Sequence, residues 1–141
     1  LHYPLRRQRQ MCIRDSYEGV EDMLKSLVDS NVKISVATNA PTQFALRMLE
    51  HLRVKPLFDV IIGADKVIEA KPSPEMLHFI LDHYKFDRKN HKAWMVGDNI
   101  KDTLSAQSAG IDSIFATWGF TPVSDAKIIV KKPIEILDIV L

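Results

Sequence analysis

The sequence has a single cysteine, Cys12, so no disulfide bond can form within the chain. It also has no cysteine or histidine pairs at the spacings typical of zinc sites, so we expect no zinc. No apolar run is long enough to cross a bilayer, and the first residues lack the charged-then-apolar order of a secretion signal. These absences favour a cytoplasmic protein with no membrane partner.

An excess of charge of one sign is also missing, because the formal net charge is +1 at pH 7. Four of the 19 basic residues, but only one of the 18 acidic residues, lie within residues 1–16, so the remainder of the chain is slightly acidic. We therefore expect no nucleic-acid partner. A length of 141 residues with 46% hydrophobic content fits one globular domain, and it leaves the oligomeric state open.

Beyond residue 17, strand-forming runs alternate with segments of helical periodicity. This alternation predicts an α/β fold with a parallel sheet covered on both faces. The expected strands are 32–37, 58–62, 93–98, 113–117 and 127–130, and the expected helices are 20–28, 41–52, 74–84, 99–109 and 134–141. Within these, Pro41 suits a first helical turn with Phe44 on the buried face, Ser73 is the expected cap before Pro74, and Gly110 is the expected left-handed stop.

The stretch from Ala93 to Asp102 holds two carboxylates four positions apart, directly after a buried strand. Asp98 would stand at the carboxyl edge of the sheet, and Asp102 would return to the same side one helical turn later. Like charges at this spacing repel unless a cation lies between them, which indicates a Mg²⁺ site. The alternative is that Asp98 caps the helix and Asp102 decorates its first turn.

Thr38 and Lys71 fall, like Asp98, directly after a strand or in the connection that follows one. Such connections share one edge of a parallel sheet, so a hydroxyl, an ammonium and a carboxylate can converge there. A phosphoryl group in transfer would be stabilised by this set together with Mg²⁺. Taken singly, Thr38 can be a strand-end threonine bonded to nearby backbone and Lys71 a solvated lysine. The cluster Trp118-Gly119-Phe120 favours core packing that extends into a turn.

Three segments in order carry a resemblance: Ser35-Val36-Ala37-Thr38-Asn39, Lys71-Pro72-Ser73-Pro74, and Val96-Gly97-Asp98-Asn99-Ile100-Lys101-Asp102. They resemble the second, third and fourth motifs of haloacid dehalogenase-like hydrolases. Ala109-Gly110-Ile111 and Thr117-Trp118-Gly119-Phe120 are similar to the phosphoglycolate phosphatase-like branch. The resemblance spans Tyr17 to Leu141 and implies a three-layer α/β/α Rossmann-like core.

The resemblance also implies roles for individual residues. Thr38 would hydrogen-bond the phosphoryl oxygens, and Lys71 would steady the nucleophile and the transferring group. Asp98 would ligate Mg²⁺, and Asp102 would support that metal site. Asn39 would help Thr38 and Lys71 to hold the substrate phosphate.

The family's first motif, an aspartate nucleophile followed two positions later by a second aspartate, should lie before residue 17 and is not there. Asp15 is a poor substitute because Tyr17 stands two positions later. The helical cap between the first two motifs is missing too. We therefore expect a fragment, a partial core over 17–141 that lacks its first, central strand. Residues 1–16 can be a basic arm or an untethered tail, but they resemble translated sequencing-adapter read-through.

The expected function is a Mg²⁺-dependent phosphatase of a small phosphorylated metabolite such as phosphoglycolate. The chain as written is not expected to turn over, because no aspartyl-phosphate can form without the nucleophile. The alternative is a non-catalytic phosphate-binding or regulatory module. A phosphoacceptor receiver domain ranks below both, because receivers place their acids before the threonine and lysine, whereas Asp98 comes last here.

Overall fold

The computed structural model describes residues 19–116 and 128–141. The elements in chain order are a helix at 19–29, β1 (Ser35–Ala37), α2 (Thr42–His51), the 3-10 turn η1 (Lys55–Leu57), β2 (Val60–Ile62), the 3-10 turn η2 (Ala64–Lys66), α3 (Glu75–His83), β3 (Trp94–Gly97), α4 (Ile100–Ala109), β4 (Asp112–Ala116), β5 (Ile129–Val130) and α5 (Ile134–Val140). Our expectations for residues 1–16 and for the Trp118-Gly119-Phe120 cluster lie outside the described residues.

Every strand pairing in the described ranges is parallel, as expected for this α/β fold. The strands form two sheets, one of β1 and β2 and one in the order β3-β4-β5. Ser35 pairs with Val60 in the first sheet, and Trp94 pairs with Asp112 in the second. Within the described ranges, 19–116 and 128–141, no backbone hydrogen-bond ladder joins β1 to β3. This break lies between the strand that ends at Ala37 and the strand that ends at Gly97.

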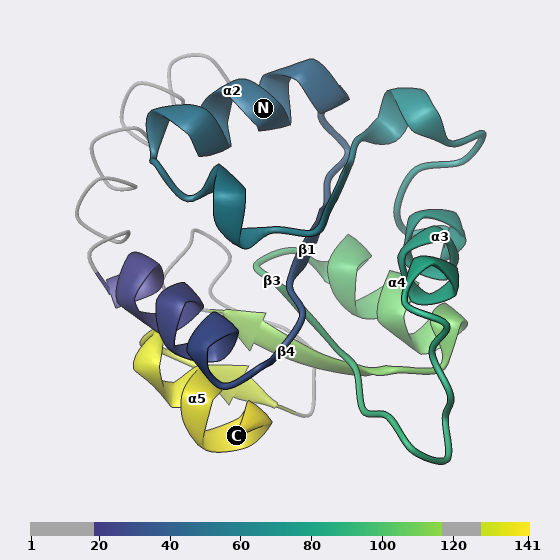
Figure 1. The fold of residues 1–141 in the computed structure, drawn as a ribbon. Coiled ribbons are helices and arrows are strands. Elements are labelled where there is room, and N and C mark those ends of the chain that lie inside the picture. Colours follow the sequence, from purple (N-terminus) through teal and green to yellow (C-terminus); the bar gives the residue numbers. More distant parts are fainter. Residues whose placement is uncertain (1–18, 117–127) are drawn as a thin grey trace.

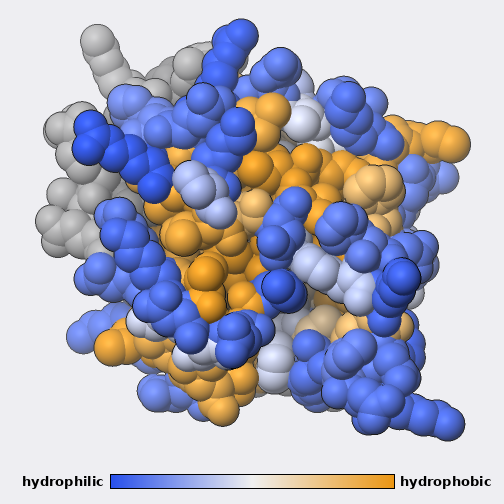
Figure 2. All heavy atoms as spheres, in the orientation of Figure 1, coloured by the Kyte–Doolittle hydropathy of each residue, from blue (hydrophilic) through white to orange (hydrophobic). Residues whose placement is uncertain are grey.

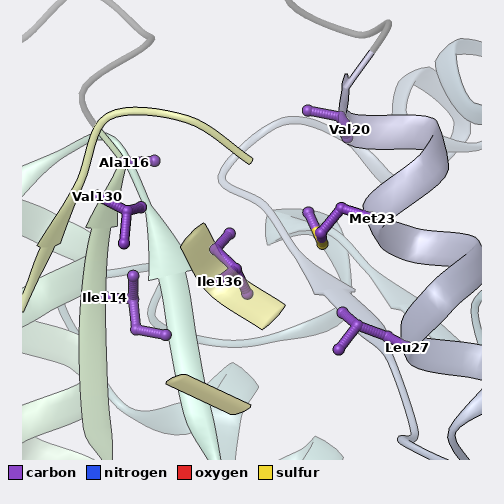
Figure 3. Close-up of a cluster of buried hydrophobic side chains, with 7 residues drawn as sticks. All are labelled: Val20, Met23, Leu27, Ile114, Ala116, Val130 and Ile136. Atoms are coloured by element: carbon purple, nitrogen blue, oxygen red, sulfur yellow. The ribbon is translucent and has the colours of Figure 1, made fainter. Parts of the chain in front are cut away.

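Two hydrophobic clusters place helices on both faces of the strands. One cluster joins the helix at 19–29 and α5 to β4 and β5, and its buried members are Val20, Met23, Leu27, Ile114, Ala116, Val130 and Ile136 (Figure 3). The other joins α3 and α4, through Leu77, Ala106 and Ala109, to Ala37 of β1 and Met95 of β3. Figure 1 shows the resulting order, with α3 and α4 on one side of the strands and the helix at 19–29 and α5 on the other. The fold is therefore a three-layer α/β/α arrangement.

The strands that border the break are less buried than β4. Ile114, Phe115 and Ala116 of β4 are 1%, 1% and 4% exposed. By contrast, no residue of β1 or β3 is fully buried, and Val96 of β3 is exposed, at 38%. Figure 2 shows a broad hydrophobic area in the centre of the same view, surrounded by polar side chains. Parallel strands are normally covered on both faces, so β1 and β3 are incompletely covered by the described residues.

Two local expectations need correction. Phe44 is 38% exposed, because α2 turns Thr42 and Ala45 inward. The helix α3 begins at Glu75 rather than at Pro74, which is the N-cap, and the Ser73 hydroxyl accepts from the Glu75 N–H at 3.3 Å. The expected stop of α4 is confirmed, since Gly110 has φ +75°. None of the helices within the described ranges is long and apolar enough to span a membrane.

Candidate functional site

Lys71 joins the end of β1 to the start of α4. Its Nζ donates to the Ala37 carbonyl at 2.8 Å and to Asp102 Oδ1 at 2.6 Å. Ala37 is the last residue of β1, and Asp102 lies in the first turn of the helix that follows β3. The loops after β1, β2 and β3 therefore meet at one edge of the strands, as expected for Thr38, Lys71 and Asp98.

The ion pair between Lys71 and Asp102 is largely shielded from water, since both side chains are only 10% exposed. A charged donor and a charged acceptor at this distance form one of the stronger hydrogen bonds found in proteins. Removing one partner would leave the other charge buried and unpaired, which costs much more than the pair itself contributes. Lys71 is thus not the solvated lysine of our alternative interpretation.

Asp102 is also part of the cap of α4. The Asn99 side chain accepts from the Lys101 N–H at 2.9 Å, and Asp102 Oδ2 accepts from the Asn99 N–H at 3.3 Å, which makes a capping box. The alternative in which Asp98 caps this helix is therefore wrong, because Asn99 takes that position. Asp102 does lie in the first turn of α4, as that alternative has it, but the residue is buried, at 7% exposed.

Gly97 allows the Asp102 carboxylate to lie where it does. A β-carbon at position 97 would come within 2.0 Å of Asp102 Oδ2, which real contacts do not reach. The glycine that ends β3 is therefore required by the packing of a side chain five residues later. The sequence marked Gly97 only as the end of a strand.

Asn39 makes two hydrogen bonds to the main chain of one residue. Its Oδ1 accepts from the Lys71 N–H at 2.9 Å, and its Nδ2 donates to the Lys71 carbonyl at 3.0 Å. Asn39 is itself exposed. The structure thus brings Asn39 and Lys71 together, and it ties the carboxamide to Lys71 rather than leaving it open to the edge.

Thr38 fits our alternative interpretation in part. Its hydroxyl oxygen accepts from the Ala40 N–H at 3.1 Å, and its own N–H donates to the Ile62 carbonyl at 3.1 Å. Because the hydroxyl acts as an acceptor here, its O–H remains available to donate to a ligand. The residue is half-buried at the edge.

Asp98 is exposed, and its carboxylate makes no hydrogen bond or ion pair with the described part of the chain. The described residues contain no group of three or more His, Cys, Asp or Glu side chains that could hold a metal ion. Mg²⁺, however, usually keeps several waters and takes only one or two carboxylates, with substrate phosphate completing its coordination. Asp98 has an open carboxylate that suits this chemistry, whereas both oxygens of Asp102 are engaged, by Lys71 and by the Asn99 N–H. Asp98 is therefore the residue of the two that could ligate a magnesium ion directly.

The loop that carries Thr38 and Asn39 is held by a neighbouring loop that sequence reasoning missed. Asp65 Oδ1 accepts from the Thr42 N–H at 2.7 Å and from the Thr42 hydroxyl at 2.8 Å, and that hydroxyl accepts from the Gly63 N–H at 2.9 Å. The hydrogen bonds from the Thr42 N–H and hydroxyl lower the pKa of Asp65. Asp65 comes shortly after a strand, as do the other edge residues, and this was its only signal in the sequence.

The comparisons with known proteins agree with this arrangement. A sequence profile of the family "Haloacid dehalogenase-like hydrolase" matches residues 7–116. The phosphoglycolate phosphatase of Aliivibrio fischeri is 34% identical over 114 residues, which cover 79% of this chain and 49% of that protein. The pyrophosphatase PpaX of Bacillus pumilus is 37% identical over 102 residues, which cover 72% of this chain and 46% of that protein. The chain thus spans about half the length of these curated relatives.

Solved structures show the same similarity. A haloacid dehalogenase-superfamily hydrolase of subfamily IA from Geobacter sulfurreducens superimposes with a TM-score of 0.74 at 29% identity, covering 86% of this chain and 59% of that one. A haloacid dehalogenase-like hydrolase from Streptococcus pneumoniae superimposes with a TM-score of 0.72 at 28% identity, covering 85% and 57%. With its family profile, its relatives and its fold in agreement, this chain belongs to the haloacid dehalogenase-like hydrolases and is similar to their phosphoglycolate phosphatase-like branch.

Proposed function

We propose that this chain carries most of the phosphate site of a Mg²⁺-dependent phosphatase that acts on a small phosphorylated metabolite such as phosphoglycolate. The observation that carries the proposal is the position of Lys71 Nζ, between the Ala37 carbonyl and Asp102 Oδ1. A fixed ammonium at the carboxyl edge is suited to negative charge that develops during phosphoryl transfer. The similarity to phosphoglycolate phosphatases supports the substrate class.

In the proposed reaction each edge residue has one task. Lys71 neutralises charge on the transferring phosphoryl group, and Thr38 donates its O–H to one of the phosphoryl oxygens. Asp98, supported by Asp102, would hold Mg²⁺, which offsets the negative charge of the phosphate oxygens when it is bound. All of these groups act by position and charge, which is where most of the catalysis of phosphoryl transfer lies.

The nucleophile is the group that the described residues do not supply. We propose that it is an aspartate on a strand that enters the break between β1 and β3, each of which has a neighbour on one side only among the described residues. An aspartate at the end of such a strand would stand between Thr38 and Asp98 at the carboxyl edge. On this proposal the chain as written binds phosphate but does not turn over, because no aspartyl-phosphate can form.

A non-catalytic phosphate-binding module is the second candidate. The observation that favours it is that the ion pair with Asp102 already offsets the charge of Lys71, while the Asp98 carboxylate is open. Such a module would bind phosphate with or without the missing strand and would never hydrolyse an ester.

The experiment that separates these candidates compares the chain as written with the same chain extended by its upstream coding sequence. Hydrolysis of p-nitrophenyl phosphate is followed with Mg²⁺ and with EDTA. We expect Mg²⁺-dependent hydrolysis by the extended protein only, and a loss of about 100-fold or more in kcat for Lys71→Ala and for Asp98→Ala. Lys92→Ala serves as the matched control, because Lys92 pairs with Asp112 on the surface. Full activity in both Lys71→Ala and Asp98→Ala would refute the roles assigned to these two residues.

A further inference from the structure

We infer that Asn39 is a positioning residue, which holds the main chain of Lys71 so that its ammonium reaches Ala37 and Asp102, rather than a ligand of the phosphate. This inference rests on the proposed function, since it concerns the same edge. It changes the role that family resemblance suggests for Asn39, from contact with substrate to placement of the lysine.

The two hydrogen bonds of Asn39 fix both the place and the orientation of one peptide segment. The carboxamide accepts from the N–H and donates to the carbonyl of Lys71, at 2.9 and 3.0 Å, across 32 positions of sequence. A side-chain amide that pairs in this way with the N–H and C=O of one residue satisfies both of its main-chain groups. Rotation of the Lys71 backbone would break at least one of the two bonds.

The backbone of Lys71 needs such a partner because the loop around it has little regular structure. The connection from η2 to α3 has further supports. Glu75 accepts from the Ile68 and Glu69 N–H groups at 2.9 and 3.1 Å, the Ser73 N–H donates to the Ala70 carbonyl at 3.0 Å, and the Ser105 hydroxyl donates to the Ser73 carbonyl at 3.0 Å. These supports lie on either side of Lys71. Asn39 supplies the one that acts on Lys71 itself.

A lysine side chain has several rotatable bonds, so a small shift at its α-carbon is enlarged at Nζ. The 2.8 Å and 2.6 Å contacts of Nζ both require the α-carbon to be in one place. Holding the main chain therefore reduces the conformational entropy that the side chain loses when it makes these contacts.

Asn39 can hold Lys71 in place because hydrogen bonds from the residues directly after β2 fix the loop that carries Asn39. The Ala64 N–H donates to the Ala40 carbonyl at 3.0 Å, and a β-carbon on Gly63 would come within 2.4 Å of that carbonyl oxygen. Thr42 is bound to Asp65 by two hydrogen bonds. The start of the connection after β2, from Gly63 to Asp65, thus holds the loop after β1. Asn39 in that loop in turn holds Lys71, which lies further along the same connection.

The test uses the chain as written, labelled with ¹⁵N, and two measurements. The first is hydrogen exchange of the Lys71 amide without any ligand, and the second is the affinity for inorganic phosphate. The variants are Asn39→Ala, Lys71→Ala, their combination, and Asn39→Asp, which keeps the acceptor and loses the donor. Asn90→Ala is the matched control, because the Asn90 side chain donates to Asp87 at 2.6 Å on the surface.

A positioning role predicts that Asn39→Ala raises the exchange rate of the Lys71 amide by about tenfold, whereas Asn90→Ala leaves it unchanged. It also predicts that Asn39→Ala and Lys71→Ala each weaken phosphate binding by roughly tenfold and that the combination is no weaker than Lys71→Ala alone. Asn39→Asp, which retains the oxygen that accepts from Lys71, should keep the amide protected but lose part of the affinity.

Two results would overturn the inference. One is an unchanged exchange rate of the Lys71 amide in Asn39→Ala, and the other is a combined variant whose loss of phosphate affinity equals the product of the single losses. If Asn39→Ala does not fold, a through-hydrogen-bond coupling between the Lys71 nitrogen and the Asn39 carboxamide carbon is sought in the parent chain labelled with both ¹³C and ¹⁵N, where its absence counts against the inference. If phosphate binds to no variant and not to the parent, the proposed function fails, while the exchange rates still decide the role of Asn39.

Discussion

Asp102 lies directly over Gly97, so that a β-carbon on Gly97 would come within 2.0 Å of Asp102 Oδ2. The same carboxylate binds Lys71 through its other oxygen and closes the cap of α4 through Asn99. One side chain therefore links the end of β3, the start of α4 and the loop after β2. The stability of the fold and the geometry of the edge depend on the same atoms.

Gly97→Ala should destabilise the chain by about 2–3 kcal/mol, because the added methyl group forces the carboxylate of Asp102 out of its place. Urea unfolding measures the loss. The control is the double variant Gly97→Ala with Asp102→Ala, in which no carboxylate remains to clash. We expect the double variant to lose less than the sum of the two single losses. Additive losses would show that the contact at Gly97 is not what constrains Asp102.

Asp102→Ala should cost about 3–5 kcal/mol in the free energy of unfolding, because it leaves the ammonium of Lys71 unpaired in a site that is only 10% exposed. The matched control is Asp112→Ala, which removes the partner of Lys92. That pair is 63% and 50% exposed, so its loss should cost no more than about 1 kcal/mol. Equal costs in the two variants, measured by urea unfolding, would contradict the shielding of the edge pair.

Much of the fold follows from local patterns. Alternating apolar runs and helical spacing predict the order of the elements, and the left-handed Gly110 ends α4 as expected. The meeting of Thr38, Lys71 and Asp98 at one edge follows from the rule that connections after parallel strands share that edge. Periodicity fails at Phe44 because this residue lies at the rim of the apolar face of α2, and the contacts that bury Thr42 and Ala45 set the centre of that face.

The individual hydrogen bonds of the edge could not be predicted in the same way. The bonds of Asn39 to Lys71 cross 32 positions, and those of Asp65 to Thr42 cross 23. No local pattern encodes a contact at that separation, because its geometry depends on how two loops pack. The alternative that made Asp98 the cap of α4 failed for a smaller reason, since Asp98 and Asn99 are both good capping residues and only the backbone dihedrals distinguish them.

Asp65→Asn should change how stability depends on pH. The hydrogen bonds from the Thr42 N–H and hydroxyl lower the pKa of Asp65 in the folded chain, so the unfolded chain takes up the proton first as the pH falls. The stabilisation is therefore complete above the ordinary value of 3.8 and is lost as the pH drops below it through the folded-state pKa. Urea unfolding of both proteins between pH 2.5 and 6, roughly the range in which carboxyl groups titrate, should show curves that converge at the acid end. Asp29→Asn, at an exposed carboxylate, is the control and should run parallel to the parent.

The rates of amide hydrogen exchange should differ between β4 and the two strands that border the break, β1 and β3. β4 pairs with both β3 and β5, and its residues from Ile114 to Ala116 are buried. β1 and β3 each have one neighbour in the described part of the chain. Because alternate amides of a strand point to opposite sides, about half of those in β1 and β3 should exchange much faster than the amides of β4. Adding the upstream sequence that fills the break should slow these amides and leave β4 unchanged. Uniformly slow exchange along β1 and β3 in the chain as written would mean that the break is already filled, and the proposal that further sequence supplies this strand would then fail.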